Sequence, residues 1–376
     1  MALVMSSPST HNDSEAGAPR RQSYPPFHSD RVAVVVNGNA KQVTKELVET
    51  LDQIVQSGDL YVSRSLDEAK DIARLIVERG YPTVLTGGGD GTFVQMVSRI
   101  VATADAKGKP LPRFGLLRLG TGNALAWVLG AQRMRESGVV ADLARLRTEG
   151  GSRKLRLIEV EDKLTPFAGL GGDAIALEHY GETKERFMKR RWLKHMASGP
   201  LVYTVSLLGK TVPKYLLHPA LQVRVVNEGG PAIRIGQHGK PLGAPLAQGE
   251  VLYEGPIRLM AFSTIPYWGF GARVFPYAED RDDRMQLRIV NFGSIEAMAH
   301  LRQIWQGTHR SDRMHDFLVE AFSVHCAEPT PLQIGGDVVG KRSVVMARLS
   351  TRPIQVVDYY SPPPMLDRMN ELDAPV

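Results

Sequence analysis

The sequence predicts an α/β domain with a parallel sheet, followed by a second domain that is mainly antiparallel β structure. From Arg31 to about residue 152, short β-branched runs alternate with segments of helical periodicity, an order typical of parallel strands joined by crossover helices. From 153 to 350, β-branched and aromatic runs separated by Gly and Pro follow one another instead. With 376 residues, the chain also exceeds the length of about 250 residues at which a single core stops growing.

The first domain, residues 31–152, is expected to alternate strands with helices. The expected strands are VAVVV (32–36), LYVS (60–63), TVLT (83–86) and FGLLRL (114–119). Apolar residues at helical spacing follow each strand and predict a helix there. The clearest signal is the capping box Ser65-Leu-Asp-Glu68, and Gly80 ends the helix that this box begins.

The second domain, residues 153–350, is expected to consist of short antiparallel strands. Candidates are LQVRVV (221–226), IRLMAF (257–262), MQLRIV (285–290) and SVVMARL (343–349). Both ends of the chain differ from the two domains. Residues 1–30 are rich in Ser, Pro and polar side chains, which predicts a disordered tail, and residues 361–376 are expected to form a loose C-terminal tail.

The composition excludes several classes of protein. The single cysteine, Cys326, excludes an internal disulfide and a thiolate zinc cluster, and the ten histidines show no metal-ligand spacing. No Gly-x-Ser-x-Gly elbow indicates a hydrolase, and no run reaches the roughly 18 apolar residues of a membrane span. We therefore expect a cytoplasmic protein. The net charge of +6 favours anionic partners, but without a known reader motif nucleic acid is not expected among them.

Two glycine-rich loops each follow a predicted strand and precede a predicted helix: TGGGDGT (86–92) and LGTGN (119–123). Ligands of open α/β sheets bind at such positions. Backbone N–H groups and the helix dipole attract a phosphate there, and glycine lets the phosphate come close. Two such loops favour a polyphosphate, although tight turns also use glycine for structural reasons alone. Neither the P-loop spacing nor Gly-x-Gly-x-x-Gly is present.

The motifs VVVNGNA (34–40), GGGDGT (87–92) and LGTGNALA (119–126) resemble the catalytic domain of the diacylglycerol kinase family. This family includes sphingosine kinases and bacterial lipid kinases, and NAD kinases share a similar first domain. The resemblance runs from about Arg31 to Val357. It implies a β-sandwich as the second domain, with substrate entering between the domains, and a return of residues 353–360 to the first domain.

The resemblance implies an ATP site formed by the glycine loops and the neighbouring strand ends. Its residues would be Asn37, Ser63, Gly88, Gly89, Asp90, Gly91, Thr92, Gly120, Thr121, Gly122 and Asn123. Ser65 is the alternative to Ser63 for the position of a family threonine. Asp90 is also the candidate ligand of Mg²⁺, either directly or through water. The alternative is a turn aspartate that hydrogen-bonds its own loop.

The candidate catalytic base is Asp337. The family has Asp-Gly-Glu at this place, with the glutamate as proposed base for the lipid hydroxyl, whereas this chain has Gly335-Gly336-Asp337. A plain hairpin turn is the alternative interpretation. Asp173, in PFAGLGGDAIAL (166–177), is the second candidate.

Two further charged segments have both a functional and a structural interpretation. Asp280 and Asp283 could form a peripheral cation site or simply belong to a solvated acidic loop. The segment Lys184–Met196, KERFMKRRWLKHM, is typical of a basic amphipathic helix on an anionic membrane surface. A solvated charged helix with its apolar side on the domain explains the segment equally well.

Together these patterns predict an ATP-dependent lipid kinase that uses Mg²⁺ and phosphorylates a hydroxyl of diacylglycerol, a sphingoid base or a related lipid. One alternative is an NAD kinase-like phosphotransferase, although the Thr-Gly-Ser-Thr-Ala-Tyr stretch of those enzymes is absent. The other is a protein that binds nucleotide and lipid but transfers phosphate weakly or not at all. The sequence does not name the lipid, and it leaves the oligomeric state open, with a homodimer among the options.

Overall fold

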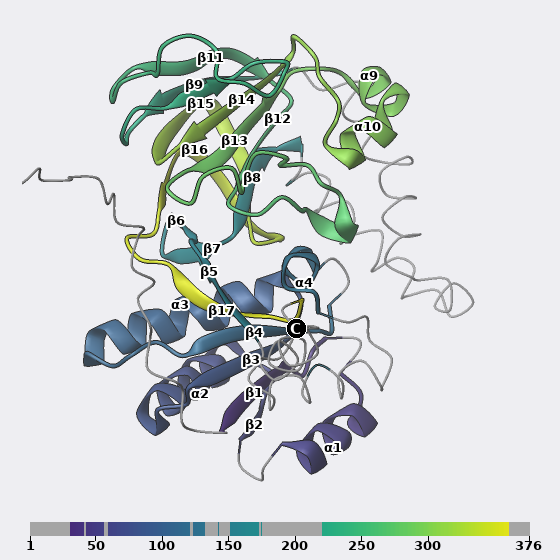
Figure 1. Ribbon diagram of the computed structural model, residues 1–376, viewed down its shortest axis with the longest axis vertical. Helices are drawn as coiled ribbons and strands as arrows, with labels where there is room; N and C mark the ends of the chain where they lie inside the picture. The colour runs from purple at the N-terminus through teal and green to yellow at the C-terminus, as the bar shows by residue number, and fades with distance from the viewer. Residues whose placement is uncertain are drawn as a thin grey trace, which may run out of the picture. The chain divides into compact units, whose positions relative to one another are not determined.

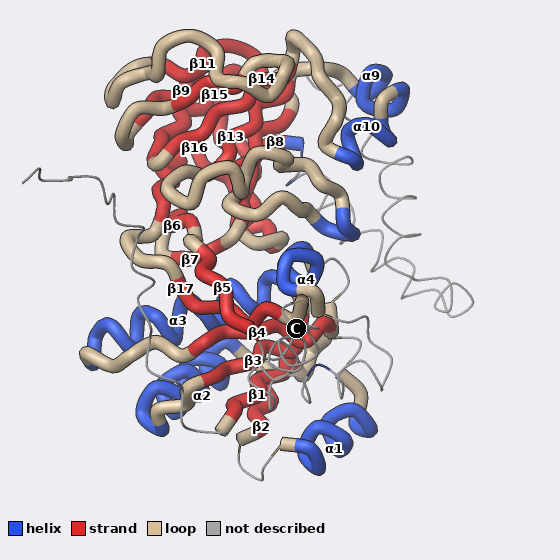
Figure 2. The backbone as a smooth tube through the Cα atoms, in the orientation of Figure 1, coloured by secondary structure: helices blue, strands red, loops and turns tan. Residues whose placement is uncertain are grey.

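Two sheets organise the part of the chain that the computed structural model describes (Figure 1). The described residues are 31–40, 43–55, 59–120, 123–131, 142, 151–172, 174 and 220–360. Both predicted tails, 1–30 and 361–376, lie outside them. Helices gather around the first sheet, whereas strands and loops dominate the second (Figure 2).

The first sheet has six strands in the order β2-β1-β3-β4-β17-β5. Their bounds are β1 (Val32–Asn37), β2 (Leu60–Ser63), β3 (Thr83–Gly88), β4 (Arg113–Arg118), β5 (Gly151–Leu155) and β17 (Ile354–Asp358). All neighbours pair in parallel except β17 and β5, which are antiparallel. The predicted parallel sheet is thus confirmed, and its carboxyl edge brings the ends of β1 to β4 together.

Four helices accompany this sheet: α1 (Lys45–Ile54), α2 (Leu66–Arg79), α3 (Asp90–Lys107) and α4 (Ala124–Leu129). The predicted capping box is present at the start of α2, where Ser65 Oγ accepts a hydrogen bond from the Glu68 N–H at 3.1 Å. Gly80 ends α2 in the left-handed conformation, as expected for a glycine C-cap. The apolar faces of the helices and the strands of the sheet bury one continuous hydrophobic core.

The second sheet is antiparallel and has eleven strands. They are β6 (Ile158–Val160), β7 (Lys163–Thr165), β8 (Phe167–Gly171), β9 (Leu221–Asn227), β10 (Ile233–Ile235), β11 (Val251–Ile257), β12 (Leu259–Ser263), β13 (Met285–Val290), β14 (Met314–Val319), β15 (Ala321–Ile334) and β16 (Asp337–Leu349). The prediction of a mainly antiparallel second domain is confirmed.

The hydrogen bonding of this second sheet is continuous, unlike that of a sandwich made of two separate sheets. The reason lies in β15, whose first half pairs with β9 and whose second half pairs with β8. A hydrophobic core includes residues of β9, β12, β13 and β15. In this core Phe262 of β12 meets Phe322 of β15 edge to face, with 5.0 Å between the ring centroids.

Three short helical segments complete the described fold: η3 (Gly269–Gly271), α9 (Ser294–Ala299) and α10 (Leu301–Gln306). The last two lie between β13 and β14. Within the described part of the chain, no helix has the length and apolar character that crossing a bilayer requires.

Candidate active site

The two predicted glycine loops are in direct backbone contact. A Cβ atom placed on Gly120 would lie 2.3 Å from the Cα and 2.7 Å from the nitrogen of Gly89. Atoms cannot approach so closely, so any other residue at position 120 would push the loops apart. The glycines therefore bring the ends of β3 and β4 together and leave bare backbone at the start of α3 and α4.

Asp90 connects the two loops through its side chain. It is the first residue of α3, and its carboxylate accepts hydrogen bonds from the first two N–H groups of α4, those of Ala124 (2.8 Å) and Leu125 (3.1 Å). Burial raises the pKa of Asp90 to about 6, although the two N–H donors act in the opposite direction. The alternative in which Asp90 hydrogen-bonds its own loop must be corrected, because its carboxylate is bonded to the start of α4, directly after the second glycine loop. Its role as a Mg²⁺ ligand stays a prediction.

Thr92, Asn37 and Gly88 form a second group of contacts at the same edge. Asn37, the last residue of β1, donates from Nδ2 to Thr92 Oγ1 at 3.3 Å. A Cβ atom on Gly88 would lie 2.4 Å from that hydroxyl oxygen, so glycine is needed there. Ser63, the last residue of β2, pairs with Asn37 in the sheet register, while its hydroxyl donates to the Ser65 carbonyl. The predicted residues on β1, β2 and β3 thus lie together.

Asn123 immediately precedes α4 and adopts the left-handed conformation, with φ of 44°. Its Nδ2 donates to the Gly120 carbonyl, which tightens the second loop. Its Oδ1 is buried and has no hydrogen-bond partner in the part of the chain that the structure describes. A buried acceptor without a donor costs free energy, so this oxygen would gain from a donor on a bound ligand.

Asp337 begins β16 directly after a two-residue hairpin turn, in which Gly335 and Gly336 have φ of 60° and 90°. Positive φ at both central residues is typical of a type I′ turn. The turn brings Asp337 to the first turn of α3, where a Cβ atom on Gly91 would lie 2.4 Å from Asp337 Oδ2. The hairpin interpretation is confirmed, and the same turn places a carboxylate beside the first glycine loop.

Gly335, which replaces the first carboxylate of the family motif, packs tightly in this structure. A Cβ atom at this position would lie 2.6 Å from Cγ2 of Val94 on α3 and 3.3 Å from the Thr165 hydroxyl oxygen. The backbone N–H of Gly335 donates to the Phe167 carbonyl at 3.0 Å. An aspartate does not fit here without movement of α3 or of the hairpin.

Charges of both signs surround Asp90 and Asp337. Burial raises the pKa of the Asp337 carboxyl, and the ammonium group of Lys163 opposes this shift. The charge of Asp337 also raises the pKa of Asp90, and Arg118 opposes it. The site therefore combines two carboxylates that favour protonation with two cations that can attract an anion.

Comparison with known proteins finds relatives in sequence and in fold. Residues 31–160 match the family model described as "Diacylglycerol kinase catalytic domain". This part of the chain is therefore similar to the catalytic domain of diacylglycerol kinases. A curated protein described as "Probable lipid kinase YegS-like", from Enterobacter sp. (strain 638), is 28% identical over 152 residues. That match covers 39% of this chain and 48% of the relative, so it spans about half of the relative's length.

Solved structures extend the likeness in fold beyond the catalytic domain. Two crystal structures from Bacillus anthracis str. Sterne, whose descriptions name diacylglycerol kinases, match with TM-scores of 0.61 and 0.58. Sequence identity is 14% and 13%, with 88% of this chain covered in both cases and 98% and 97% of the other chains. At this identity the match shows the fold alone.

Among the residues that match the family model, Arg118 was missed by the sequence analysis. It has a recognisable signal, because it is a charged residue at the end of an otherwise apolar strand, directly before the second glycine loop. Lys163, which follows the family match, was also missed. No motif marks it, and only the packing of β7 along α3 brings it near Asp337.

The remaining predicted residues lie away from the two glycine loops or outside the described residues. Thr121, Gly122, Asp173 and the segment Lys184–Met196 lie outside the described residues. Asp283 pairs with Arg281 at 2.8 Å and with Arg284 at 3.0 Å, while Asp280 is exposed. Among the described residues, no group of three or more acidic, histidine or cysteine side chains could hold a metal ion. The structure offers no support for the peripheral cation site, which stays a prediction.

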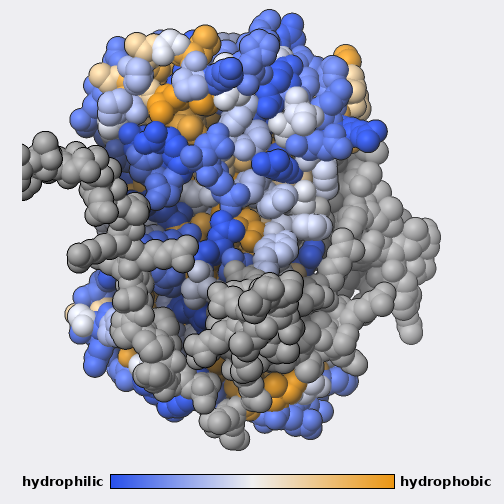
Figure 3. All heavy atoms as spheres, in the orientation of Figure 1, coloured by the Kyte–Doolittle hydropathy of each residue, from blue (hydrophilic) through white to orange (hydrophobic). Residues whose placement is uncertain are grey.

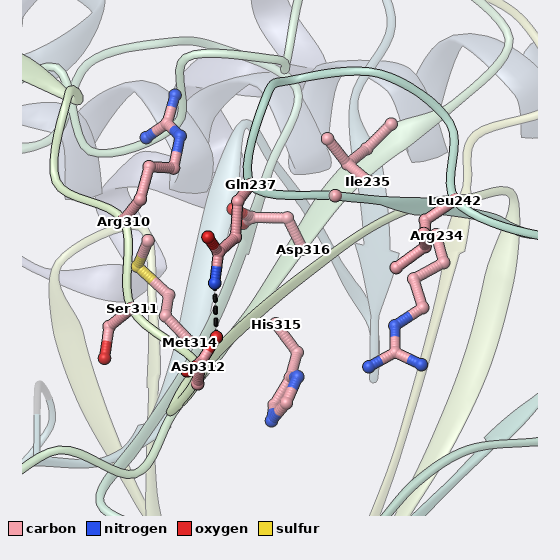
Figure 4. A pocket seen from close by; sticks show the side chains of 11 residues that line it. Arg234, Ile235, Gln237, Leu242, Arg310, Ser311, Asp312, Met314, His315 and Asp316 are labelled. Carbon is pink, nitrogen blue, oxygen red and sulfur yellow. Dashed lines mark hydrogen bonds between the residues drawn. The ribbon is translucent and has the colours of Figure 1, made fainter.

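A pocket of about 140 Å³ lies between β10, β14 and the segments that follow and precede them (Figure 4). Arg234, His315 and Leu242 line it, together with the hydrogen-bonded pair Gln237 and Asp312. None of the residues predicted for the kinase site takes part. This pocket is therefore separate from the candidate active site at the two glycine loops.

Proposed function

We propose that this protein is an ATP-dependent lipid kinase that transfers the γ-phosphate to a hydroxyl of diacylglycerol, a sphingoid base or a related lipid. The observation that carries the proposal is the position of Asp337 against Gly91. It puts a carboxylate at the first turn of the helix that follows the first glycine loop. A base beside the triphosphate site is what deprotonation of an acceptor alcohol requires.

The residues at the carboxyl edge of the parallel sheet fit the triphosphate of ATP. Gly88, Gly89 and Gly120 leave no Cβ in the way, and the 18-residue helix α3 begins there without a side-chain cap. The helix dipole and the cations Arg118 and Lys163 would attract the phosphates. The match of residues 31–160 to the diacylglycerol kinase family model supports ATP as the phosphate donor.

Asp90 is the carboxylate of this site that could hold Mg²⁺. Both oxygens of Asp90 already accept a backbone N–H, so water-mediated contact suits it better than direct ligation. Bound Mg²⁺ would neutralise part of the charge on the phosphates. In the transfer itself, Asp337 accepts the proton of the lipid hydroxyl, the hydroxyl oxygen forms its bond to the γ-phosphorus, and ADP leaves.

The direct test supplies the purified protein with labelled ATP, Mg²⁺ and a total lipid extract, with NAD and sphingosine in parallel reactions. Each product that gains phosphate is identified by mass. A labelled lipid supports the proposal and names the substrate class. Label in NADP alone would assign the protein to NAD phosphorylation instead.

Replacement of Asp337 by Asn tests the proposed base. We expect kcat to fall by about 10²–10⁴-fold, the usual contribution of a positioned base, while the nucleotide dissociation constant measured by calorimetry stays unchanged. Asp71→Asn, at an exposed position on α2, serves as the matched control and should retain full activity. Equal activity of the Asp337→Asn variant and the wild type would show that Asp337 is not the base.

A second candidate function is a protein that binds nucleotide and lipid but transfers phosphate weakly. Two observations favour it: Gly335 takes the place of one carboxylate of the family motif, and both oxygens of Asp90 are engaged by α4. A protein of this kind would bind nucleotide but label no acceptor. The wild type and Asp337→Asn would then both lack measurable turnover.

A further inference from the structure

The two short helices α9 and α10 expose most of their large apolar side chains, which a helix on a protein surface usually buries. Ile295, Met298, Leu301 and Trp305, which we call the α9–α10 face, all point outward, with Ile295 73% and Trp305 42% exposed. Their spacing of three, three and four residues places them along one side of the helix pair. In Figure 3, apolar surface appears at the upper right, where Figure 1 places α9.

Polar contacts and the half-buried Ile304 anchor the helix pair to the protein. The ring of His300 stacks on the buried His309, with 4.7 Å between their centroids, and Glu296 lies 3.4 Å from the same histidine. None of the residues of α10 is buried. A surface helix normally buries its large apolar residues, so those exposed on α9 and α10 favour an apolar partner beyond the described residues.

The charge around the α9–α10 face favours an anionic partner. Glu296 is the one acidic residue within the two helices, and Arg313 lies 3.8 Å from it. Arg302 on α10 and Arg273 beside its end are exposed. Arginines that border an outward tryptophan and aliphatic residues are typical of surfaces that enter the headgroup region of a bilayer.

The α9–α10 face is also connected to the candidate active site. The N–H of Arg273 donates to the Trp305 carbonyl at 2.8 Å, which joins α10 to the segment that follows η3. On the other side, a Cβ atom on Gly271 of η3 would lie 2.8 Å from the Trp127 ring of α4. Helix α4 is the one that Asp90 caps. A chain of direct contacts therefore leads from the α9–α10 face to the glycine loops.

We propose that the α9–α10 face docks the protein on an anionic lipid bilayer, with Ile295, Met298, Leu301 and Trp305 in the headgroup region and the arginines on the lipid phosphates. The biological role of this docking rests on the proposed lipid kinase function. The docking itself is a physical property that can be measured without ATP. Docking would bring the active site to a lipid acceptor that stays in its membrane.

The test measures binding of the full chain to vesicles of phosphatidylcholine with and without phosphatidylglycerol, by flotation. The variant replaces all four residues of the α9–α10 face by Gln. We expect its partitioning to anionic vesicles to fall by about tenfold or more, because the apolar contact is lost. Leu66→Gln, which changes a 60% exposed leucine on α2, is the matched control and should bind like wild type. All four replaced side chains are exposed, so the melting temperature should stay close to that of wild type.

A second measurement locates Trp305 in the bilayer. Vesicles with brominated acyl chains should quench part of the tryptophan fluorescence of the wild type, and this part should disappear in Trp305→Phe. Unchanged vesicle binding of the fourfold variant would overturn the proposal. So would a change in self-association in sedimentation velocity without a change in vesicle binding, since the partner would then be a second copy. Binding that depends on the α9–α10 face in a protein without kinase activity would uphold the docking and refute the proposed function alone.

Discussion

Asp90 combines a structural role with an unusual acidity. Its carboxylate caps α4 from the first turn of α3 and is buried, which raises its pKa from 3.8 to about 6. The folded protein therefore binds this proton more tightly than the unfolded chain. The stability that this proton provides is complete below pH 3.8 and is lost as the pH rises through 6. This shift in pKa corresponds to about 3 kcal/mol when it is fully expressed.

We expect Asp90→Asn to remove this pH dependence. The free energy of unfolding of the wild type should fall by about 2 kcal/mol between pH 4 and pH 7 from this group, and urea denaturation at several pH values measures it. The variant should lack this fall, and because Asp90 is protonated at pH 4, the uncharged amide of Asn should cost least stability there. An unchanged pH dependence in the variant would assign the effect to another group.

At the scale of residues, the sequence predicted the positions of the loop glycines better than the contacts of the charged side chains. Gly88, Gly89 and Gly120 could be found because their bare backbone follows from a loop between strand and helix. The role of Asp90 could not, because its partners Ala124 and Leu125 lie more than thirty positions away and bind through their backbone. Lys163 carries no local pattern, since only the packing of β7 on α3 brings it near Asp337.

At the scale of elements, the β15–β16 hairpin depends on two glycines with different surroundings. Gly335 faces Val94 Cγ2, which a Cβ atom would approach to 2.6 Å, whereas nothing lies within 4 Å of a Cβ atom on Gly336. Alanine at either position should lower the free energy of unfolding by about 1–2 kcal/mol, because its Cβ disfavours the left-handed backbone conformation. Gly335→Ala should lose about 1–3 kcal/mol more than Gly336→Ala, because it also crowds α3.

A double-mutant cycle in urea denaturation separates these two costs. Val94→Ala should recover part of the loss in the Gly335→Ala protein and none of it in Gly336→Ala. Kinase activity should follow the same order, since movement of the hairpin carries Asp337 away from Gly91. Equal stability of the two glycine variants would show that the contact with Val94 has no energetic consequence.

Elements with a local signal were predictable, and those that depend on distant partners were less so. Ser65 and Glu68 indicate the start of α2, and Gly80 indicates its end. The change of partner along β15, which keeps the hydrogen bonding of the second sheet continuous, has no comparable signal. Its two halves differ in their neighbours β9 and β8, and a strand's own residues do not encode which strand pairs with it.

At the scale of the whole molecule, both sheets depend on shared parts. The chain leaves the parallel sheet after β5 and returns to it after β16 to add β17 between β4 and β5. Helix α3 belongs to both parts as well: most of its apolar residues lie in the first core, while Val94 lies in the second. Residues 31–376 form one compact unit. We therefore expect the two sheets to unfold together.

Val356→Ala tests this coupling at the centre of β17. Val356 is fully buried between β4 and β5, and loss of its two methyl groups should cost about 2 kcal/mol. The whole transition should move to lower temperature in calorimetry, circular dichroism and tryptophan fluorescence, although the substitution lies in the parallel sheet. Val344→Ala, at an exposed position of β16, should leave the transition in place. Two transitions, with only one of them shifted by Val356→Ala, would show that the antiparallel sheet is stable without β17.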